Sequence, residues 1–252
     1  MQDVRFFSAA LGHEVVYRVY VPASVPQNKK LRVVYLLHGN GGTYRDWSNF
    51  SDVAQYARQG ILLVMPDGAS SYYVNAVKHS KDKYGDFLTH DLLADVEARF
   101  PARKDRAGRA LVGVSMGGYA AVEYALAQPD LFAFAGAISP ALDVPSRKFS
   151  WKHLGQSLRF RGIFGADGST EREALDPFVQ VRTANPQTAP YLYMTAGGQE
   201  PMLAPIQRFA ARLKQRNFAF EFHTKPGGHD WNEWNAQISD CFQKLQTELT
   251  NN

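Results

Sequence analysis

The amino-acid sequence predicts a three-layer α/β fold, in which helices cover both faces of a mostly parallel sheet. Short, continuous apolar runs recur along the chain, and such runs are typical of strands buried on both faces. The runs are Val33–Leu37, Ile61–Met65, Ala110–Val114, Ala133–Ile138 and Tyr191–Ala196. Segments with helical periodicity lie between several of these runs, and this alternation favours a parallel sheet.

The remaining elements are predicted from their own patterns. Val4–Phe7 and Val15–Val21 are expected to be two extended segments joined by a turn. In residues 205–216, apolar side chains recur at i, i+3, i+4 and i+7, as on the buried face of a helix. A similar stripe starts at Trp234 and predicts the last helix, while Phe218–His223 alternates as a half-buried strand does.

One segment departs from the alternation of strand and helix. Residues 141–175 show no clear periodicity, and residues 144–166 contain five Arg or Lys and no acidic residue. A long insertion of this kind is often a lid or a binding loop. We therefore expect residues 1–252 to form a single domain, with an irregular cap inserted at about 141–175. The basic surface of this cap is interpreted as solvated, with an anion-attracting rim as the alternative.

Composition and charge exclude several classes of protein. The 252 residues are 45% hydrophobic and 13% aromatic, which excludes low-complexity disorder. The net charge of +4 is scattered and forms no basic stripe, so we expect no nucleic-acid partner. No apolar run approaches the ~20 residues that span a bilayer. A single cysteine, Cys241, excludes an internal disulfide and a cysteine-based zinc cluster.

The motif that points to chemistry is G-x-S-x-G, from Gly113 to Gly117. An apolar run leads directly into it and a helix-compatible stretch follows, which is the strand–turn–helix context of a nucleophile elbow. The two glycines are required because the turn leaves no room for side chains two residues before and after the serine. Ser115 would then stand above the sheet edge, where the Met116 N–H can stabilise an oxyanion.

A serine hydroxyl needs a general base to act as a nucleophile. In hydrolases with this elbow, the base is a histidine late in the chain. His229 fits best, because it lies in a glycine-rich segment directly after the last predicted strand. His223 lies within that strand. His38 comes too early in the chain and is interpreted as shaping the turn that follows its strand.

An acid is expected to orient the histidine, and it should follow the penultimate strand. Glu200 is favoured because it lies in the loop directly after Tyr191–Ala196. Asp176 is the alternative, although it also has the pattern of a helix N-cap with Pro177 at the first helical position. The sequence leaves the choice between these two acids open.

A second backbone donor to the oxyanion is expected from the loop after an early strand. Glycines at positions 39, 41 and 42 allow the backbone to approach a ligand closely, and the Asn40 N–H is the candidate donor. A phosphate-binding loop is the alternative for this glycine-rich segment. Neither a G-x-G-x-x-G pattern nor a Walker lysine follows, so this alternative is disfavoured.

Together, these residues resemble the esterase D and feruloyl esterase branch of the α/β-hydrolases, to which the antigen 85 mycolyltransferases are related. The resemblance covers the whole chain and rests on Phe6-Phe7-Ser8, Val19-Tyr20-Val21-Pro22, Leu36-Leu37-His38-Gly39, Trp47, Pro66-Asp67-Gly68, Gly113-Val114-Ser115-Met116-Gly117-Gly118, Gly228-His229-Asp230-Trp231 and Trp234. It implies an α/β-hydrolase fold, with Ser115 as nucleophile and His229 as base. It also implies Asn40 and Met116 as oxyanion donors. The family usually has Asp where this chain has Glu200.

The predicted function is that of a serine carboxylesterase, which hydrolyses a small-molecule ester through an acyl-enzyme without a metal or organic cofactor. The enzymatic alternatives are a feruloyl or acetyl-xylan esterase, an S-formylglutathione hydrolase and an acyltransferase. A catalytically silent binding module is the alternative from another class.

The first residues lack the pattern of a signal peptide, so we expect a cytoplasmic protein, with a trimmed secreted or periplasmic form as the alternative. A homodimer would suit an enzyme of this kind.

Overall fold

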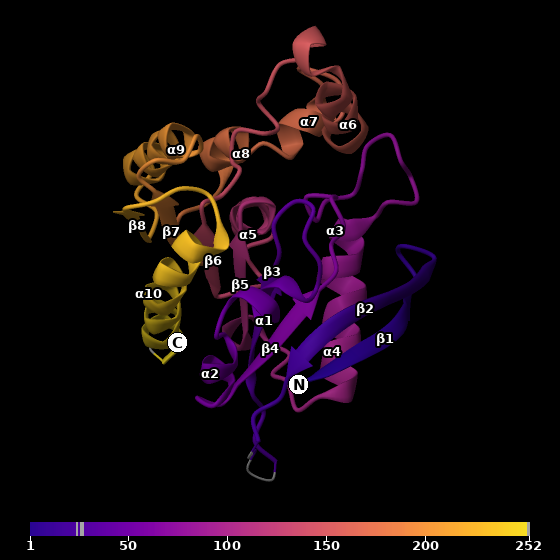
Figure 1. Cartoon of the computed structure of the whole chain (residues 1–252), viewed down its shortest axis with the longest axis vertical. Coiled ribbons are helices and arrows are strands. Elements are labelled where there is room, and N and C mark those ends of the chain that lie inside the picture. The colour runs from indigo at the N-terminus through magenta and orange to yellow at the C-terminus, as the bar shows by residue number, and fades with distance from the viewer. Residues whose placement is uncertain (24, 26–27, 251–252) are drawn as a thin grey trace.

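The computed structural model describes residues 1–23, 25 and 28–250 and contains an eight-stranded sheet (Figure 1). The strands are β1 (Gln2–Ser8), β2 (His13–Tyr20), β3 (Arg32–Leu37), β4 (Ile61–Pro66), β5 (Arg109–Val114), β6 (Phe134–Ile138), β7 (Tyr191–Gly197) and β8 (Phe220–Lys225). Their order in the sheet is β1-β2-β4-β3-β5-β6-β7-β8. The pairs β1–β2 and β2–β4 are antiparallel and every other pair is parallel. The predicted α/β-hydrolase fold class is confirmed.

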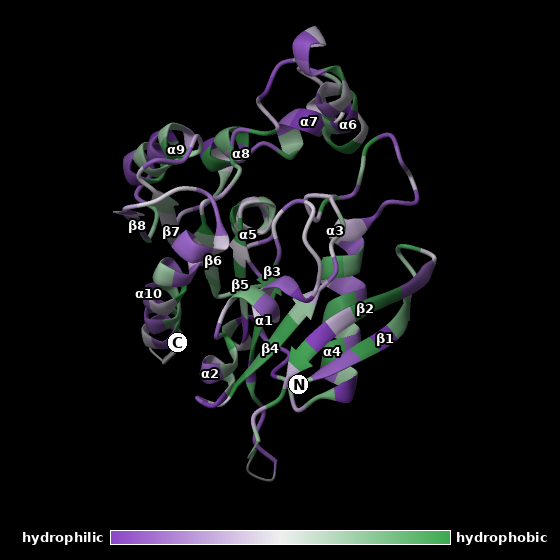
Figure 2. Cartoon of the chain, viewed as in Figure 1, coloured by the Kyte–Doolittle hydropathy of each residue, from purple (hydrophilic) through white to green (hydrophobic). Residues whose placement is uncertain are grey.

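Helices cover both faces of the sheet and account for the continuous apolar runs. In β3, Val33 and Tyr35 pack into the core on one face, whereas Val34 and Leu36 pack into the core on the other. Successive side chains of a strand point to opposite faces, so a strand covered on both sides must be apolar at every position. Figure 2 shows this as predominantly hydrophobic central strands, beside helices such as α9 and α10 that carry hydrophilic residues.

The helical elements divide between the two faces. One core contains side chains from η1, α4, α5 and α9, and the other contains side chains from α1, α2 and α10. Their bounds are α1 (Asp46–Phe50), α2 (Ala54–Ala57), α3 (Tyr84–Asp86), the π-helix η1 (Phe87–Leu92), α4 (Leu93–Arg99), the 3-10 turns η2 (Arg106–Gly108) and η3 (Trp151–His153), α5 (Met116–Ala127), α6 (Leu154–Phe164), α7 (Thr170–Ala174), α8 (Pro177–Thr183), α9 (Leu203–Gln215) and α10 (Trp231–Thr250).

The 141–175 segment contains η3, α6 and α7, although its sequence shows no clear periodicity. The reason is visible in α6, where Phe160, Ile163 and Phe164 are buried while Leu154 and Leu158 are exposed. Apolar residues on both sides of a helix produce no single stripe, and a stripe is the signal that sequence analysis detects. Figure 1 shows these helices beyond the edge of the sheet at which the parallel strands end.

Candidate active site

Ser115 occupies the tight turn between β5 and α5. Its φ of +53° is costly for a residue with a side chain, and such strain is concentrated at functional sites. A Cβ placed on Gly113 would lie 2.2 Å from the carbonyl carbon of Gly117. A Cβ on Gly117 would lie 2.2 Å from the carbonyl oxygen of Leu37. Only glycine therefore fits at these two positions, as the motif predicts.

His229 and Glu200 lie beside this serine. His229 is in the loop between β8 and α10, and its Nε2 is 2.9 Å from Ser115 Oγ. Its Nδ1 is 2.6 Å from Glu200 Oε2. The buried Glu200 carboxylate also accepts the Gly197 N–H at 3.1 Å, which fixes its orientation. The fold thus forms a continuous chain of hydrogen bonds across residues that are 114 and 29 positions apart in the sequence.

Asp176, the other candidate acid, lies in a different environment. Its carboxylate accepts the Phe178 N–H at 2.9 Å and the Ser146 hydroxyl at 2.5 Å. It is the N-cap of α8, with Pro177 at the start of the helix. Burial raises the pKa of the Asp176 carboxyl against the opposing effect of these hydrogen bonds. Of the two candidates, Glu200 is the one that contacts His229.

Two backbone N–H groups are available close to the serine. Met116 is the first residue of α5, where an N–H has no acceptor within its own helix. The Asn40 N–H donates no hydrogen bond to another described residue. Asn40 follows Gly39, and a Cβ placed on Gly39 would lie 3.6 Å from Ser115 Cβ. The loop after β3 therefore passes directly beside the serine.

His38 fixes the orientation of that loop. Its buried ring accepts the Gly68 N–H at Nε2 (2.9 Å), so its proton is on Nδ1, which donates to the Gly39 carbonyl oxygen at 2.8 Å. In a planar trans peptide, the Gly39 C=O and the Asn40 N–H point in opposite directions. By holding the carbonyl, His38 sets the direction of the Asn40 N–H. Burial lowers the pKa of His38, which keeps the ring neutral.

Two residues next to the site were not identified as site residues by any sequence pattern. The Tyr73 hydroxyl accepts the His38 N–H at 3.0 Å, and the Arg159 guanidinium donates to the side-chain oxygen of Asn40. These pairs are 35 and 119 residues apart, so no local pattern indicates them. Gly68 was detectable, because it belongs to the Pro66-Asp67-Gly68 motif.

Two further features concern the residues that the structure describes. Within it, no three His, Cys, Asp or Glu side chains are grouped as metal ligands would be. Within the same residues, no helix combines the length and apolar character needed to cross a membrane.

The fold and this site define the class of protein. A mostly parallel sheet, with a strained serine where a strand meets a helix and a histidine and acid in later loops, is the arrangement of the α/β-hydrolases. Residues 8–245 match the model of the family described as "Putative esterase". The chain belongs to this family and is a carboxylic ester hydrolase.

Relatives and solved structures resemble the chain over most of its length. It is 23% identical to an acetyl esterase of Caldicellulosiruptor saccharolyticus, over 96% of the chain and 97% of that protein. It is 28% identical to the diacylglycerol acyltransferase/mycolyltransferase Ag85B of Mycobacterium avium, over 86% of the chain and 75% of that protein. The structure of FphF, a fluorophosphonate-binding serine hydrolase of Staphylococcus aureus, has a TM-score of 0.81 at 23% identity, covering 98% of this chain and 97% of that one. A ferulic acid esterase has a TM-score of 0.79 at 22% identity, with the same coverage.

Proposed function

We propose that the chain is a serine carboxylesterase in which Ser115 is the nucleophile, His229 the general base and Glu200 the acid. The observation that carries the proposal is the chain of hydrogen bonds from Ser115 Oγ through both ring nitrogens of His229 to Glu200. This arrangement allows the hydroxyl to donate its proton to Nε2, while the carboxylate holds the proton on Nδ1.

The reaction follows from these contacts. Ser115 Oγ attacks the ester carbonyl carbon as its proton moves to His229 Nε2, and the carbonyl oxygen becomes an oxyanion that accepts the N–H groups of Asn40 and Met116. The C–O bond to the alcohol then breaks, and His229 gives its proton to the departing oxygen. Water attacks the resulting acyl-enzyme after losing a proton to His229, and the carboxylic acid leaves as Ser115 regains its hydrogen.

Glu200 supports both halves of this cycle. Its side chain is fully buried, so its charge acts on the imidazolium with little screening by water. The Gly197 N–H holds the second carboxylate oxygen, which leaves Oε2 directed at His229. A glutamate is one methylene longer than the aspartate usual in the resembled family, and this side chain still reaches the ring at 2.6 Å.

The proposal includes the organisation of the chain. We assign residues 1–252 to one domain and residues 141–175 to a cap over the carboxyl edge of the sheet. The continuous sheet and the contact between Arg159 of α6 and Asn40 support this assignment. A homodimer, which would suit an enzyme of this kind, and a cytoplasmic location are part of the same proposal.

The experiment is to compare Ser115→Ala with Ser70→Ala, a half-buried serine in the loop after β4 that is outside the hydrogen-bond chain. Ser115→Ala should reduce hydrolysis of p-nitrophenyl acetate to trace levels, whereas Ser70→Ala should keep the native rate. A fluorophosphonate should lose fluoride to attack by Ser115 Oγ, which adds its phosphonyl group to the peptide that contains Ser115. Labelling of another residue, or full activity in Ser115→Ala, would overturn the proposal.

A further inference from the structure

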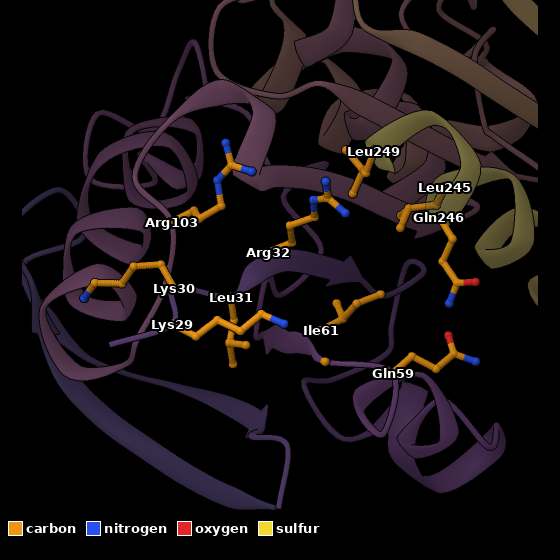
Figure 3. Close-up of a pocket in the computed structure, with 11 residues that line it drawn as sticks. Lys29, Lys30, Leu31, Arg32, Gln59, Ile61, Arg103, Leu245, Gln246 and Leu249 are labelled. Atoms are coloured by element: carbon orange, nitrogen blue, oxygen red, sulfur yellow. The ribbon is translucent and has the colours of Figure 1, made fainter. Parts of the chain in front are cut away.

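A cavity of about 680 Å³ lies where β3 and β4 begin (Figure 3). It is bounded by the residues that begin β3 and β4, by the segment that precedes β5 and by the last turns of α10. The proposed triad lies at the carboxyl ends of the parallel strands, and this cavity lies at their amino ends. It is therefore separate from the site described above.

The lining of this cavity is strongly cationic. Among the residues that the structure describes, it includes Lys29, Lys30, Arg32 and Arg103 and no carboxylate side chain. Arg103 is paired with Asp105 at 2.7 Å. Lys29, Lys30 and Arg32 form no ion pair or side-chain hydrogen bond with any residue that the structure describes. These three positive charges thus have no counter-charge among the described residues.

The charged ends of Lys29, Lys30 and Arg32 do not all point into the cavity. Figure 3 shows the Lys29 ammonium extending across the cavity below the Arg32 guanidinium, whereas Lys30 points away from it. Partial burial, together with the nearby charge of Arg103, lowers the pKa of Arg32. Like charges that lose water and lie close together repel each other, and an anion placed between them would relieve that repulsion.

The rest of the lining is apolar or neutral. Leu31 and Ile61 line the cavity where β3 and β4 begin, and Leu249 of α10 also lines it (Figure 3). A ligand here would meet two kinds of surface, positive charge and hydrocarbon. Inorganic ions use only the first of these surfaces, whereas an anion carried on a short apolar body uses both.

We propose that this cavity is a second ligand site, which binds an organic anion with a carboxylate or phosphate head. Lys29 and Arg32 hold the head, and Leu31 and Ile61 contact the apolar part. The proposal does not rest on the catalytic roles assigned above, because no residue of the proposed triad lines this cavity.

The test is isothermal titration calorimetry with hexanoate and hexyl phosphate, which separates the two head groups. A Lys29→Gln/Arg32→Gln double variant should raise the Kd of whichever probe binds about tenfold or more, the loss expected for charge-assisted hydrogen bonds. Lys30→Gln should change it little. Lys152→Gln, an exposed lysine in η3, is the matched control and should leave it unchanged. Binding that persists in the double variant belongs to another site, including the oxyanion donors beside Ser115.

Several results would overturn the proposal. These are an unchanged Kd in the double variant, equally tight binding of hexan-1-ol, and inorganic phosphate binding as tightly as hexyl phosphate. Hydrolysis of p-nitrophenyl acetate and the thermal midpoint establish that the double variant is folded. A second measurement needs no variant: binding of the probe to the native protein must weaken as salt is added, because salt screens the cations.

Discussion

The Arg159 guanidinium donates a hydrogen bond to the side-chain oxygen of Asn40, which joins α6 to the loop after β3. Asn40 also provides one of the proposed oxyanion donors. Arg159 is exposed and forms no ion pair with a described residue, whereas Arg147 in the same segment pairs with Asp143. An uncompensated cation therefore contacts the loop that passes beside Ser115, and this favours the anion-attracting alternative for the rim of the 141–175 segment.

Replacing Arg159 by Gln should affect charged and neutral esters differently. We expect kcat/KM for p-nitrophenyl hydrogen adipate, which carries a carboxylate, to fall about tenfold, because the cation that attracts it is lost. For neutral p-nitrophenyl hexanoate the fall should be about threefold or less, from the loosened Asn40. Lys152→Gln is the control for net charge. An equal loss on both esters would show that Arg159 only positions Asn40.

Replacing Glu200 by Gln should lower kcat by on the order of 10³–10⁴, because an amide stabilises the wrong tautomer of His229. Glu200→Asp keeps the charge and should recover part of that loss. Asp176→Asn is the matched variant of the other candidate acid. It should keep kcat and reduce stability by about 1 kcal/mol, because the amide oxygen keeps the N-cap bond to the Phe178 N–H while the amide nitrogen cannot accept the Ser146 hydroxyl. Steady-state kinetics and urea unfolding measure the two effects, and the opposite pattern would reassign the acid to Asp176.

His38→Gln should lower kcat more than it changes KM. Glutamine can still accept the Gly68 N–H but does not reproduce the bond to the Gly39 carbonyl, so the Asn40 N–H loses its fixed direction. Removing an oxyanion donor lowers kcat about 10²–10³-fold, and this sets the upper limit of the effect of His38→Gln. A change confined to KM would contradict the positioning role.

The same residue makes stability depend on pH. The pKa of folded His38 is lowered by burial, so the unfolded chain binds more protons below about pH 6.5, the ordinary pKa of histidine. The stabilising effect of the neutral ring is present above that pH and is lost as the pH falls through the folded pKa. Thermal midpoints between pH 5 and 8 should therefore decline more steeply toward acid in the native protein than in His38→Gln.

Gly117→Ala should destabilise the fold by about 3 kcal/mol or more, because the added methyl would lie 2.2 Å from the Leu37 carbonyl oxygen. Neither the backbone of α5 nor that of β3 can move away to relieve this clash. Gly155→Ala is a matched control within α6, where nothing lies within 4 Å of the added carbon. That change should be neutral or stabilise by about 0.5–1 kcal/mol, as expected for alanine in a helix. Urea unfolding of both variants measures the difference. Similar stability in the two would refute the steric account of the elbow.

Much of the fold was predictable because its signals are local. The buried strands appear as apolar runs, and β3, β4, β5, β6 and β7 start and end within one residue of the predicted bounds. The G-x-S-x-G motif is likewise local, since the clash that demands glycine occurs within a single turn and the strand beside it. The helices of the 141–175 segment were not predicted, because α6 carries apolar side chains on two sides.

The sequence by itself determined the class of fold, the strained serine and the histidine late in the chain, since each depends on the composition of a short segment. Tertiary structure decided which acid reaches His229, because both are carboxylates and only the folded positions of their loops bring Glu200, and not Asp176, to the ring. It also decided the contacts of Arg159 with Asn40 and of His38 with Gly39 and Gly68. Such contacts form only when the order of strands in the sheet brings distant loops to the same edge.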